Sequence, residues 1–322
     1  MRLFCKVGAI GMLLGICFLG HFALPDQDEV AKPSKIDPSI MMPLASKALL
    51  LGLTKAGELM AVAGEHGIIL ISKDQGKTWK QSSVPTRVML TGIFFLDENN
   101  GWAIGHNETI LHTVDGGVSW ELVRQHLDRD PFLDIWFENE NKGIIAGAYG
   151  ILFMTTDGGK TWQEKTVNEE DDMHLNQITS AENGKLYIAA ERGLAYSSID
   201  GGETWVTLET PYEGSYFGIL PLEGEVVLLF GLRGHLFRSE NAGVGWQEIQ
   251  TGTNALLNDG LMKTDGTILI GGMGGTVLRS QDGGRTFVLS KQSKQRGISS
   301  LIENNQGQVI FAGEGGVQEL EP

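Results

Sequence analysis

The sequence predicts an all-β fold, a seven-bladed β-propeller of four-stranded antiparallel blades. Two observations carry this prediction. An eight-residue motif built around an aspartate occurs six times, and an apolar strand pair around a short turn occurs seven times. A unit that recurs at a fixed period of about 40 residues is typical of a repeat array, which folds as one body and not as several domains.

The aspartate motif sets the period. Its copies read SKDQGKTW, TVDGGVSW, TTDGGKTW, SIDGGETW, SENAGVGW and SQDGGRTF, and their third positions are Asp74, Asp115, Asp157, Asp200, Asn241 and Asp282. The successive steps are 41, 42, 43, 41 and 41 residues. An active site is normally assembled once in a domain, so six copies favour a structural device.

Each period contains the same succession of apolar runs and turns. In the second period, LTGIFFLDENN, GWAIGHNE, TILHTVDGG and SWELVRQ follow one another. Three runs of strand length are separated by turn residues, and a fourth short strand follows the motif. Four antiparallel strands in about 42 residues are typical of a propeller blade.

The mismatch between seven strand pairs and six motifs has a simple explanation. One further step from Asp282 would place the next motif at position 323, so the last unit, Gly297 to Leu320, should contain three strands. We expect the segment Ile36 to Leu44 to add the missing strand and close the ring, because sheet proteins avoid unpaired edges. Six blades followed by a hairpin are the alternative.

The chain begins with a basic and apolar segment. Arg2 and Lys6 precede an apolar run from Val7 to Leu24, which predicts a signal peptide or membrane anchor over residues 1–24 and an exported, periplasmic or extracytoplasmic protein. Residues 25–43 are interpreted as a linker with the closing strand, and 44–322 as the propeller. Both cysteines lie in the first segment, at positions 5 and 17, so the propeller has no thiols.

Charge limits the partners that the chain can bind. The formal net charge is −15 and the pI about 4.9. Such a surface repels phosphate backbones, so nucleic-acid binding is disfavoured.

Every residue of the motif has a structural task. The aspartate can accept backbone N–H groups of the turn, the glycines permit unusual backbone angles, and the aromatic residue can pack between blades. Asn241 and Phe287 replace the usual residues in two copies, which preserves turn geometry but would not preserve nucleophile or metal chemistry. The aromatic positions are Trp79, Trp120, Trp162, Trp205, Trp246 and Phe287.

These copies resemble the Asp-box, or bacterial neuraminidase repeat. The longer pattern GAYGILFMTTDGGKTW from Gly147 looks like the repeat of the photosystem II stability and assembly factor family. That resemblance covers about Leu44 to Leu320. It implies an exported, non-enzymatic seven-bladed propeller that assists the assembly or stability of a membrane-associated protein complex, a role in photosynthesis for family members, and no cofactor.

A binding site should lie on the face opposite the motifs. In a four-stranded blade, the turns between strands two and three share a face with the connections between blades. This face gives the candidates for partner binding: Arg87, His106, Glu108, Arg129, Asp130, Tyr149, Glu191, Arg192, Tyr212, Arg233 and His235. Tyrosine and arginine are the residue types that most often anchor protein interfaces.

Two other interpretations of this face stay open. A sialidase-like glycosidase would need an arginine cluster with a tyrosine and carboxylates, or the face could bind a glycan without cleaving it. The acidic loop NEEDDMH from Asn168 lacks the spacing of a calcium loop, and the histidines lack close pairing, so no metal site is expected. We therefore predict a protein-binding module with no catalytic residues and no nucleic-acid partner.

Overall fold

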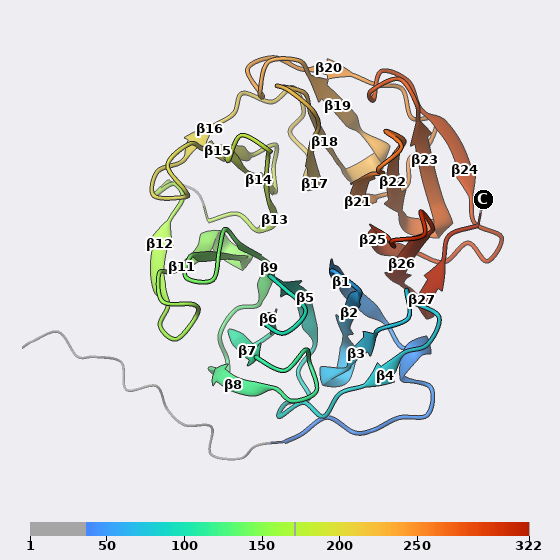
Figure 1. The fold of residues 1–322 in the computed structure, drawn as a ribbon. Helices are drawn as coiled ribbons and strands as arrows, with labels where there is room; N and C mark the ends of the chain where they lie inside the picture. The colour runs from blue at the N-terminus through green and yellow to red at the C-terminus, as the bar shows by residue number, and fades with distance from the viewer. Residues whose placement is uncertain (1–36, 171, 322) are drawn as a thin grey trace, which may run out of the picture. The chain divides into compact units, whose positions relative to one another are not determined.

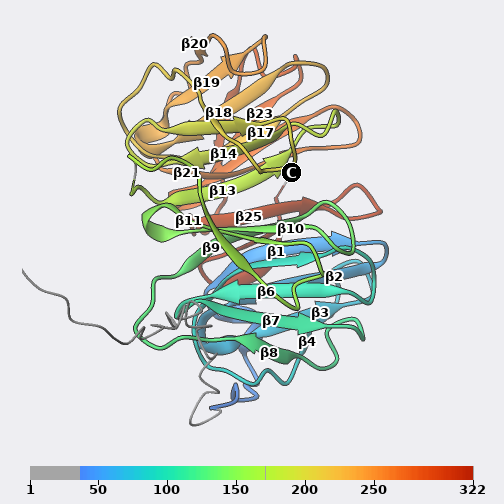
Figure 2. The same ribbon diagram turned by 90° about the vertical axis from the view of Figure 1, so that its left-hand side faces the viewer.

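The computed structural model describes residues 37–170 and 172–321. Within the unit that spans residues 33–322, seven antiparallel sheets follow one another around a ring (Figure 1). Seen from the side, successive sheets stack face to face (Figure 2). The seven-bladed propeller is confirmed, and the six-bladed alternative is wrong.

Each sheet forms one blade, and chain order within a blade is spatial order from the centre outward. Blade 1 contains β1 (Leu50–Ala56), β2 (Leu59–Gly64), β3 (Ile69–Ser72) and β4 (Lys80–Gln81). Blade 2 contains β5 (Leu90–Phe95), β6 (Gly101–Gly105), β7 (Thr109–Thr113) and β8 (Glu121–Arg124). Blade 3 contains β9 (Phe132–Phe137), β10 (Gly143–Gly147), β11 (Ile151–Thr155) and β12 (Gln163–Thr166). Blade 4 contains β13 (Leu175–Ser180), β14 (Leu186–Ala190), β15 (Ala195–Ser198) and β16 (Val206–Thr207).

The remaining blades complete the ring. Blade 5 contains β17 (Tyr216–Pro221), β18 (Val227–Gly231), β19 (Leu236–Ser239) and β20 (Gln247–Glu248). Blade 6 contains β21 (Leu257–Met262), β22 (Ile268–Gly272), β23 (Thr276–Ser280) and β24 (Val288–Lys291). Blade 7 contains only β25 (Ile298–Glu303), β26 (Val309–Gly313) and β27 (Gly316–Glu319). Five single 3₁₀ turns are the only helices in the described ranges: η1 (Ala45–Lys47), η2 (Glu65–Gly67), η3 (Ala148–Gly150), η4 (Leu232–Gly234) and η5 (Met273–Gly275).

The core lies between the blades. The second strand of every blade is buried along its whole length, as its apolar sequence requires. Trp102 and Phe137, from blades 2 and 3, stack with ring centroids 3.7 Å apart. Because each sheet is covered on both faces, the ring supplies a rigid frame for its loops.

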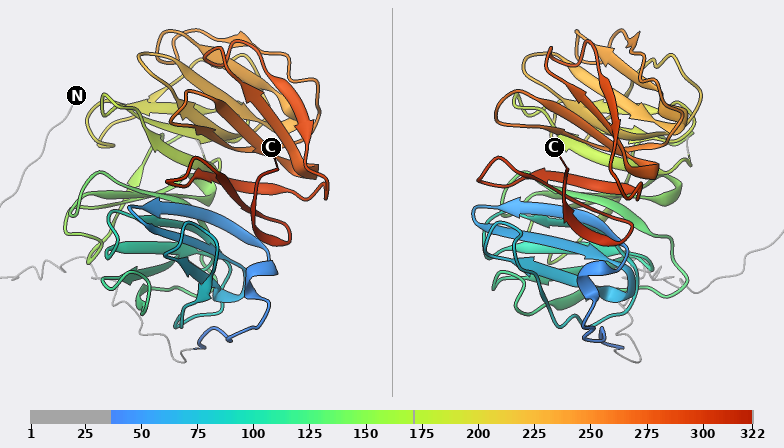
Figure 3. Two further views of the ribbon diagram at one scale, coloured as in Figure 1. Left: turned by 45° about the vertical axis from the view of Figure 1, so that its right-hand side comes forward. Right: turned by 90° about the vertical axis from the view of Figure 1, so that its right-hand side faces the viewer.

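Blade 7 closes the ring against blade 1, as Figure 3 shows. Asn304 Nδ2 donates to the Gln75 carbonyl oxygen at 3.1 Å, and the Asn305 N–H donates to Gln75 Oε1 at 2.7 Å. Ile310 of β26 belongs to the same buried cluster as Met60 and Leu70 of blade 1. Closure therefore rests on packing and side-chain hydrogen bonds between whole blades.

The expected closing strand is not formed. Residues 37–44, the described part of the segment, contain no strand and lie along the outer edge of blade 1. The Ser39 N–H donates to the Val84 carbonyl at 2.8 Å, and Gln81 binds the backbone of Ile40 and Met42. The prediction was wrong because β4 is only two residues long, so its own free edge holds this segment.

The predicted signal peptide or anchor lies outside the described residues. In residues 37–170 and 172–321, no helix has the length and apolar character needed to cross a bilayer.

Candidate functional site

The Asp boxes are closed hydrogen-bond systems. In blade 4, Ser198 Oγ accepts the Gly202 N–H at 3.0 Å and donates to Asp200 Oδ1 at 2.8 Å. Asp200 Oδ1 also accepts the Thr204 N–H at 3.0 Å, and Oδ2 accepts the Thr204 hydroxyl at 2.6 Å. The same bonds recur in blades 1, 2, 3 and 6.

These donors stabilise the ionised carboxylates. The hydroxyl of the following Thr or Ser, with its backbone N–H, lowers the pKa of Asp74, Asp115 and Asp200 to about 2. The N–H of Thr286 and its hydroxyl hold the pKa of Asp282 well below its usual value. Carboxylates whose oxygens already accept several donors are poorly placed to act as nucleophiles or metal ligands.

The degenerate box of blade 5 lacks both the hydroxyl donor of the usual Thr or Ser and the second carboxylate oxygen that accepts it. Asn241 Oδ1 still accepts the Gly245 N–H at 2.9 Å and the Ser239 hydroxyl at 2.9 Å. Gly245 occupies the position of the usual Thr or Ser, so no hydroxyl is left that needs the second carboxylate oxygen. The turn survives because its backbone contact is kept.

The box also fixes one blade to the preceding one. A Cβ on Gly202 would approach Ile144 Cδ1 of blade 3 to 2.5 Å, so any other residue would have to displace this side chain and also adopt a φ of 91°. Trp205 packs on the same cluster as Ile144 and Met154. The Nε1–H groups of Trp79 and Trp162 donate to carbonyls of their own boxes at 3.0 Å.

The two faces of the ring are built differently. On one face, the Asp box is hydrogen-bonded to the turn between strands one and two of its own blade. In blade 3, for example, the Gly158 N–H donates to the Asn141 carbonyl. On the other, the turn between strands two and three binds the connection that follows the blade. Examples are the Gly150 N–H to the Met173 carbonyl and the Gly193 N–H to the Gly214 carbonyl. We call this second surface the tip face.

Two consecutive residues at the tip of every blade have a positive φ, and the first residue of each pair is called the tip residue. The seven tip residues are His66 (57°), Asn107 (59°), Tyr149 (53°), Arg192 (52°), Arg233 (57°), Gly274 (63°) and Gly315 (80°). Left-handed backbone favours glycine, since other residues pay a steric penalty of about 1 kcal/mol or more. Five of the seven blades nevertheless carry a side chain here, and in the sequence this signal appears only when the seven turns are aligned.

Most of the predicted residues are accessible on the tip face. Tyr149 is 58% exposed. Arg87, His106, Arg129, Arg192 and Arg233 are exposed, while Asp130, Glu191, Tyr212 and His235 are partly buried.

Two small clusters of these side chains form between neighbouring blades. His174 lies 3.2 Å from the Glu191 carboxylate and packs edge-on against Tyr149, with centroids 4.7 Å apart. In blade 5, His235 stacks on Tyr212 at 4.1 Å and contacts Glu248 at 3.0 Å. Beside the second cluster is a cavity of about 560 Å³ lined by Arg233, His235 and residues 248–254.

Some of the residues that the sequence suggested are not available to a partner. Glu108 is only 3% exposed, and its carboxylate is bonded to the Arg124 guanidinium, which also lies over the Phe153 ring. Tyr216, which follows Tyr212 at the start of β17, is fully buried, and burial raises the pKa of its hydroxyl to about 12. Arg87 is accessible but bonded to Asp37 and to the Pro38 carbonyl.

Sequence reasoning missed two acidic residues in the central channel. Asp134 Oδ2 accepts the Ile178 N–H of the next blade at 2.9 Å, and Asp259 Oδ2 accepts the Leu301 N–H at 2.8 Å. Desolvation by burial in the channel raises the pKa of Asp134 to about 7, and it also raises the pKa of Asp259. They occupy the third position of their first strands, which holds Gly52, Gly92, Asp134, Gln177, Gly218, Asp259 and Ser300 in turn.

The arrangement of the arginines does not resemble a carboxylate clamp. Arg87 and Arg129 belong to connections after blades 1 and 2, and Arg192 and Arg233 to the tips of blades 4 and 5. The cavity beside Arg233 contains none of the other three in its lining. Among the described residues, no group of three histidines, cysteines or carboxylates could hold a metal ion.

Seven blades joined by these turns define the class of the molecule, an Asp-box β-propeller. The model of the family described as photosynthesis system II assembly factor YCF48 matches residues 71–132 and 123–260. The chain belongs to this family.

Curated relatives match over short segments. The chloroplastic photosystem II stability/assembly factor HCF136 of Cyanidioschyzon merolae is 38% identical over 80 residues, 24% of this chain and 17% of that protein. Photosystem II assembly protein Ycf48 of Thermosynechococcus vestitus is 38% identical over 53 residues, 16% of this chain and 15% of that protein. The matched segments thus span less than a fifth of either relative.

Solved structures share the fold over most of the chain. A structure described as YCF48 bound to D1 peptide aligns with a TM-score of 0.71 and 18% identity, covering 87% of this chain and 94% of that chain. A streptogramin B lyase aligns with a TM-score of 0.73 and 14% identity, covering 88% and 95%. At these identities the likeness concerns the fold alone, which accommodates both binding proteins and enzymes.

Proposed function

We propose that this propeller is a non-enzymatic assembly factor that binds a segment of a partner protein on its tip face. The family and its named relatives support an assembly role. A related propeller has been solved with a peptide of another protein, which supports a polypeptide ligand.

The observation that carries the proposal is the left-handed tip residues. Gly274 and Gly315 show that glycine is sufficient for this turn. Tyr149, Arg192 and Arg233 adopt the same backbone at a conformational cost, and their side chains remain exposed. Such a choice gives a binding surface three residues of the types that dominate interface energetics.

Charge indicates which segments would bind. Arg192 and Arg233 occupy equivalent tips of adjacent blades on a chain whose net charge is −15. Neither forms a salt bridge with a described residue. Guanidinium groups without carboxylate partners favour a segment that brings carboxylates, and Tyr149 can pack against its apolar part.

The location is part of the proposal. The basic and apolar residues 1–24 support export, and the complexes named for the relatives support a membrane-associated partner. We propose that the protein acts outside the cytoplasm on a membrane protein complex.

Crosslinking and capture from the native membrane fraction test this proposal. The wild-type chain should retain subunits of a membrane complex, and the Arg192→Gly/Arg233→Gly variant should lose most of them. The matched control is Lys142→Ala/Lys160→Ala, which removes two cations from the Asp-box face and should capture normally. Equal capture by all three proteins would contradict the proposal, as would glycoside turnover that Tyr149→Phe abolishes.

A further inference from the structure

Blade 7 ends in a sheet edge with which no described strand pairs. The Leu320 N–H donates to the Val309 carbonyl. In the pairing of β27 with β26, the backbone groups that point inward, to β26, are therefore those of Gln318 and Leu320. Hydrogen bonds alternate along an antiparallel ladder, and therefore the N–H and C=O groups of Val317 and Glu319 point outward. These are the groups that a fourth strand would bind.

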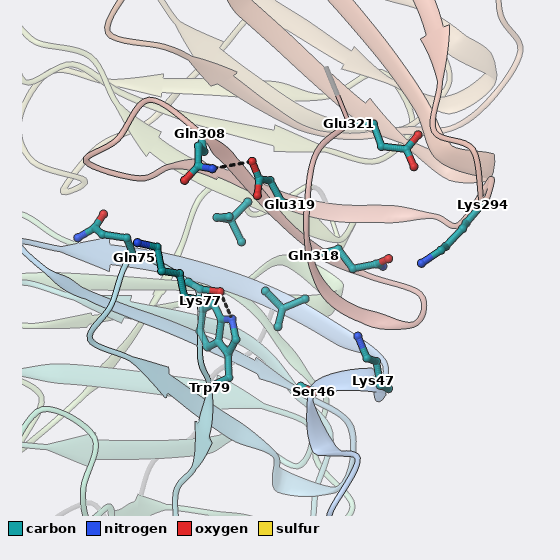
Figure 4. A pocket seen from close by; sticks show the side chains of 13 residues that line it. Ser46, Lys47, Gln75, Lys77, Trp79, Lys294, Gln308, Gln318, Glu319 and Glu321 are labelled. Carbon is teal, nitrogen blue, oxygen red and sulfur yellow. Dashed lines mark hydrogen bonds between the residues drawn. The ribbon is translucent and has the colours of Figure 1, made fainter.

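A groove of about 610 Å³ runs along this edge. Figure 4 shows Gln318 and Glu319 of β27 on one side and Lys77 and Trp79 of the first Asp box on the other. In blade 3 the corresponding place is filled by β12, whose Lys165 lies 3.4 Å from Glu203 in the next box. The groove is therefore the position of the missing strand.

The size of the groove suits a short extended segment. The fourth strands of the other blades contain two to four residues. Four extended residues span about 13 Å. The groove volume also falls in the range of about 300–1,000 Å³ typical of ligand sites.

The lining lacks partners for several polar groups. Lys47, Lys77 and Lys294 are exposed, and none forms a salt bridge with a described residue. The two carboxylates are already engaged, because Glu319 accepts Gln308 Nε2–H at 2.8 Å and Glu321 binds Ser293. Hydrogen bonds from Ser293, and to a smaller extent the nearby charge of Lys294, lower the pKa of the Glu321 carboxyl. Three ammonium groups against two carboxylates still leave the lining net positive on a strongly acidic chain, which favours a ligand with carboxylates.

A buried amide supplies a second, independent indication. Gln318 Nε2 is buried at the groove and has no hydrogen-bond acceptor among the described residues. A buried donor without an acceptor costs about 1–3 kcal/mol. A carbonyl of an added strand would satisfy it if the Gln318 side chain turns towards the groove.

The described N-terminal segment does not fill the groove. It runs beside β4, and η1 packs against the start of β27: Ala45 shares a buried cluster with Val317, and a Cβ on Gly316 would lie 1.8 Å from the Ser46 carbonyl oxygen. We propose that the open edge of blade 7 binds an extended acidic segment of another protein, which adds as the fourth strand. This proposal is independent of the tip face.

Amide hydrogen exchange followed by NMR tests the edge itself. In the full chain, the Val317 and Glu319 amides should exchange quickly, while the Gln318 and Leu320 amides are protected. Protection of all four without ligand would overturn the proposal. If that protection rises with protein concentration, the occupant is a second copy, and if it does not, the occupant is the chain's own residues 1–36.

Selection from a displayed random heptapeptide library tests the ligand. Peptides retained by the full chain should be rich in Asp and Glu and in β-branched residues, and they should protect the Val317 and Glu319 amides. Glu319→Pro removes one outward N–H and leaves the inward bonds, so it should weaken binding at least tenfold, while Glu319→Gln binds nearly normally.

Charge and tip-face variants complete the test. Lys77→Glu/Lys294→Glu should also weaken binding, and Arg192→Gly/Arg233→Gly should not. Selected peptides that bind Glu319→Pro as tightly as wild type, or the absence of any selected peptide, would overturn the proposal.

Discussion

The Asp boxes and the tips both depend on left-handed backbone, but they differ in how often the first left-handed residue is glycine. In the box of blade 4, Gly201 and Gly202 have φ of 74° and 91°. At the tips of blades 4 and 5, Arg192 and Arg233 adopt 52° and 57°. Four of the six boxes have glycine at both left-handed positions, with Gln75 and Ala242 as the exceptions, whereas five of the seven tip residues present a side chain at a conformational cost.

Within one repeat, the box therefore has a structural role and the tip is available for binding. The serine, aspartate and threonine of a box bind one another, and little remains for a ligand. A tip residue can change from blade to blade because the turn is held by backbone bonds to the next connection. We therefore expect box substitutions to reduce stability and tip substitutions to reduce binding.

The largest loss of stability should come from the second box glycine. Gly202→Ala places a methyl group against buried Ile144 in addition to the cost of positive φ, and should lower the free energy of unfolding by about 2–4 kcal/mol. Gly201→Ala is the matched control, because its Cβ meets nothing within 4 Å and only the backbone cost of about 1–2 kcal/mol applies. Urea unfolding measures both, and equal losses would contradict the packing of the box on blade 3.

The box serine should have a smaller effect. Ser198→Ala removes the acceptor of the buried Gly202 N–H and should cost about 1–3 kcal/mol. Partner capture per folded molecule should stay unchanged. A loss of capture at full folding would place the box in the binding surface and contradict the separation.

The channel aspartate should give stability an unusual pH dependence. The pKa of Asp134 is about 7 in the folded state against an ordinary 3.8, so its contribution is fully present below about pH 4 and is lost as the pH rises through 7. Asp74, Asp115 and Asp200 behave in the opposite sense, losing their contribution as the pH falls from 3.8 towards 2.

Asp134→Asn isolates this effect, because the amide oxygen can still accept the Ile178 N–H. Relative to wild type, the variant should become more stable between pH 4 and pH 7.5 in chemical unfolding. A difference that does not change with pH would show that Asp134 is ionised throughout.

The smallest change in stability should come from a tip. Arg233→Gly relieves a backbone cost of about 1 kcal/mol, but glycine raises the entropy of the unfolded chain by a similar amount, so the free energy of unfolding should change by no more than about 0.5 kcal/mol. Thermal unfolding checks this. A large loss would assign Arg233 a structural role.

Much of the fold could be predicted because each repeat contains the same turn residues and the same apolar runs. The Asp-Gly-Gly turn of Asp200 and the apolar run before it are visible in one copy and reinforced by five others. Even the three-stranded last blade follows from the spacing. The path of residues 37–44 could not be predicted, since it depends on the short β4 and on Gln81, which binds both Ile40 and Met42.

The candidate site was predicted less completely, because local sequence does not determine side-chain burial. Glu108 looks like an exposed turn residue, yet the positive φ at Asn107 and Glu108 accompanies a buried contact with Arg124. Asp134 stands in an ordinary strand, and only the closed ring brings it to the Ile178 N–H. Both outcomes depend on neighbours that lie outside the local repeat.

The most direct test of the account compares partner capture with stability in two variants of the full chain. Capture from the native membrane fraction, normalised to the folded fraction, is measured for Arg192→Gly/Arg233→Gly and for Ser198→Ala. The account predicts that the first loses capture at wild-type stability and that the second keeps capture at reduced stability. Normal capture by the arginine variant, with lost capture by the serine variant, would contradict it.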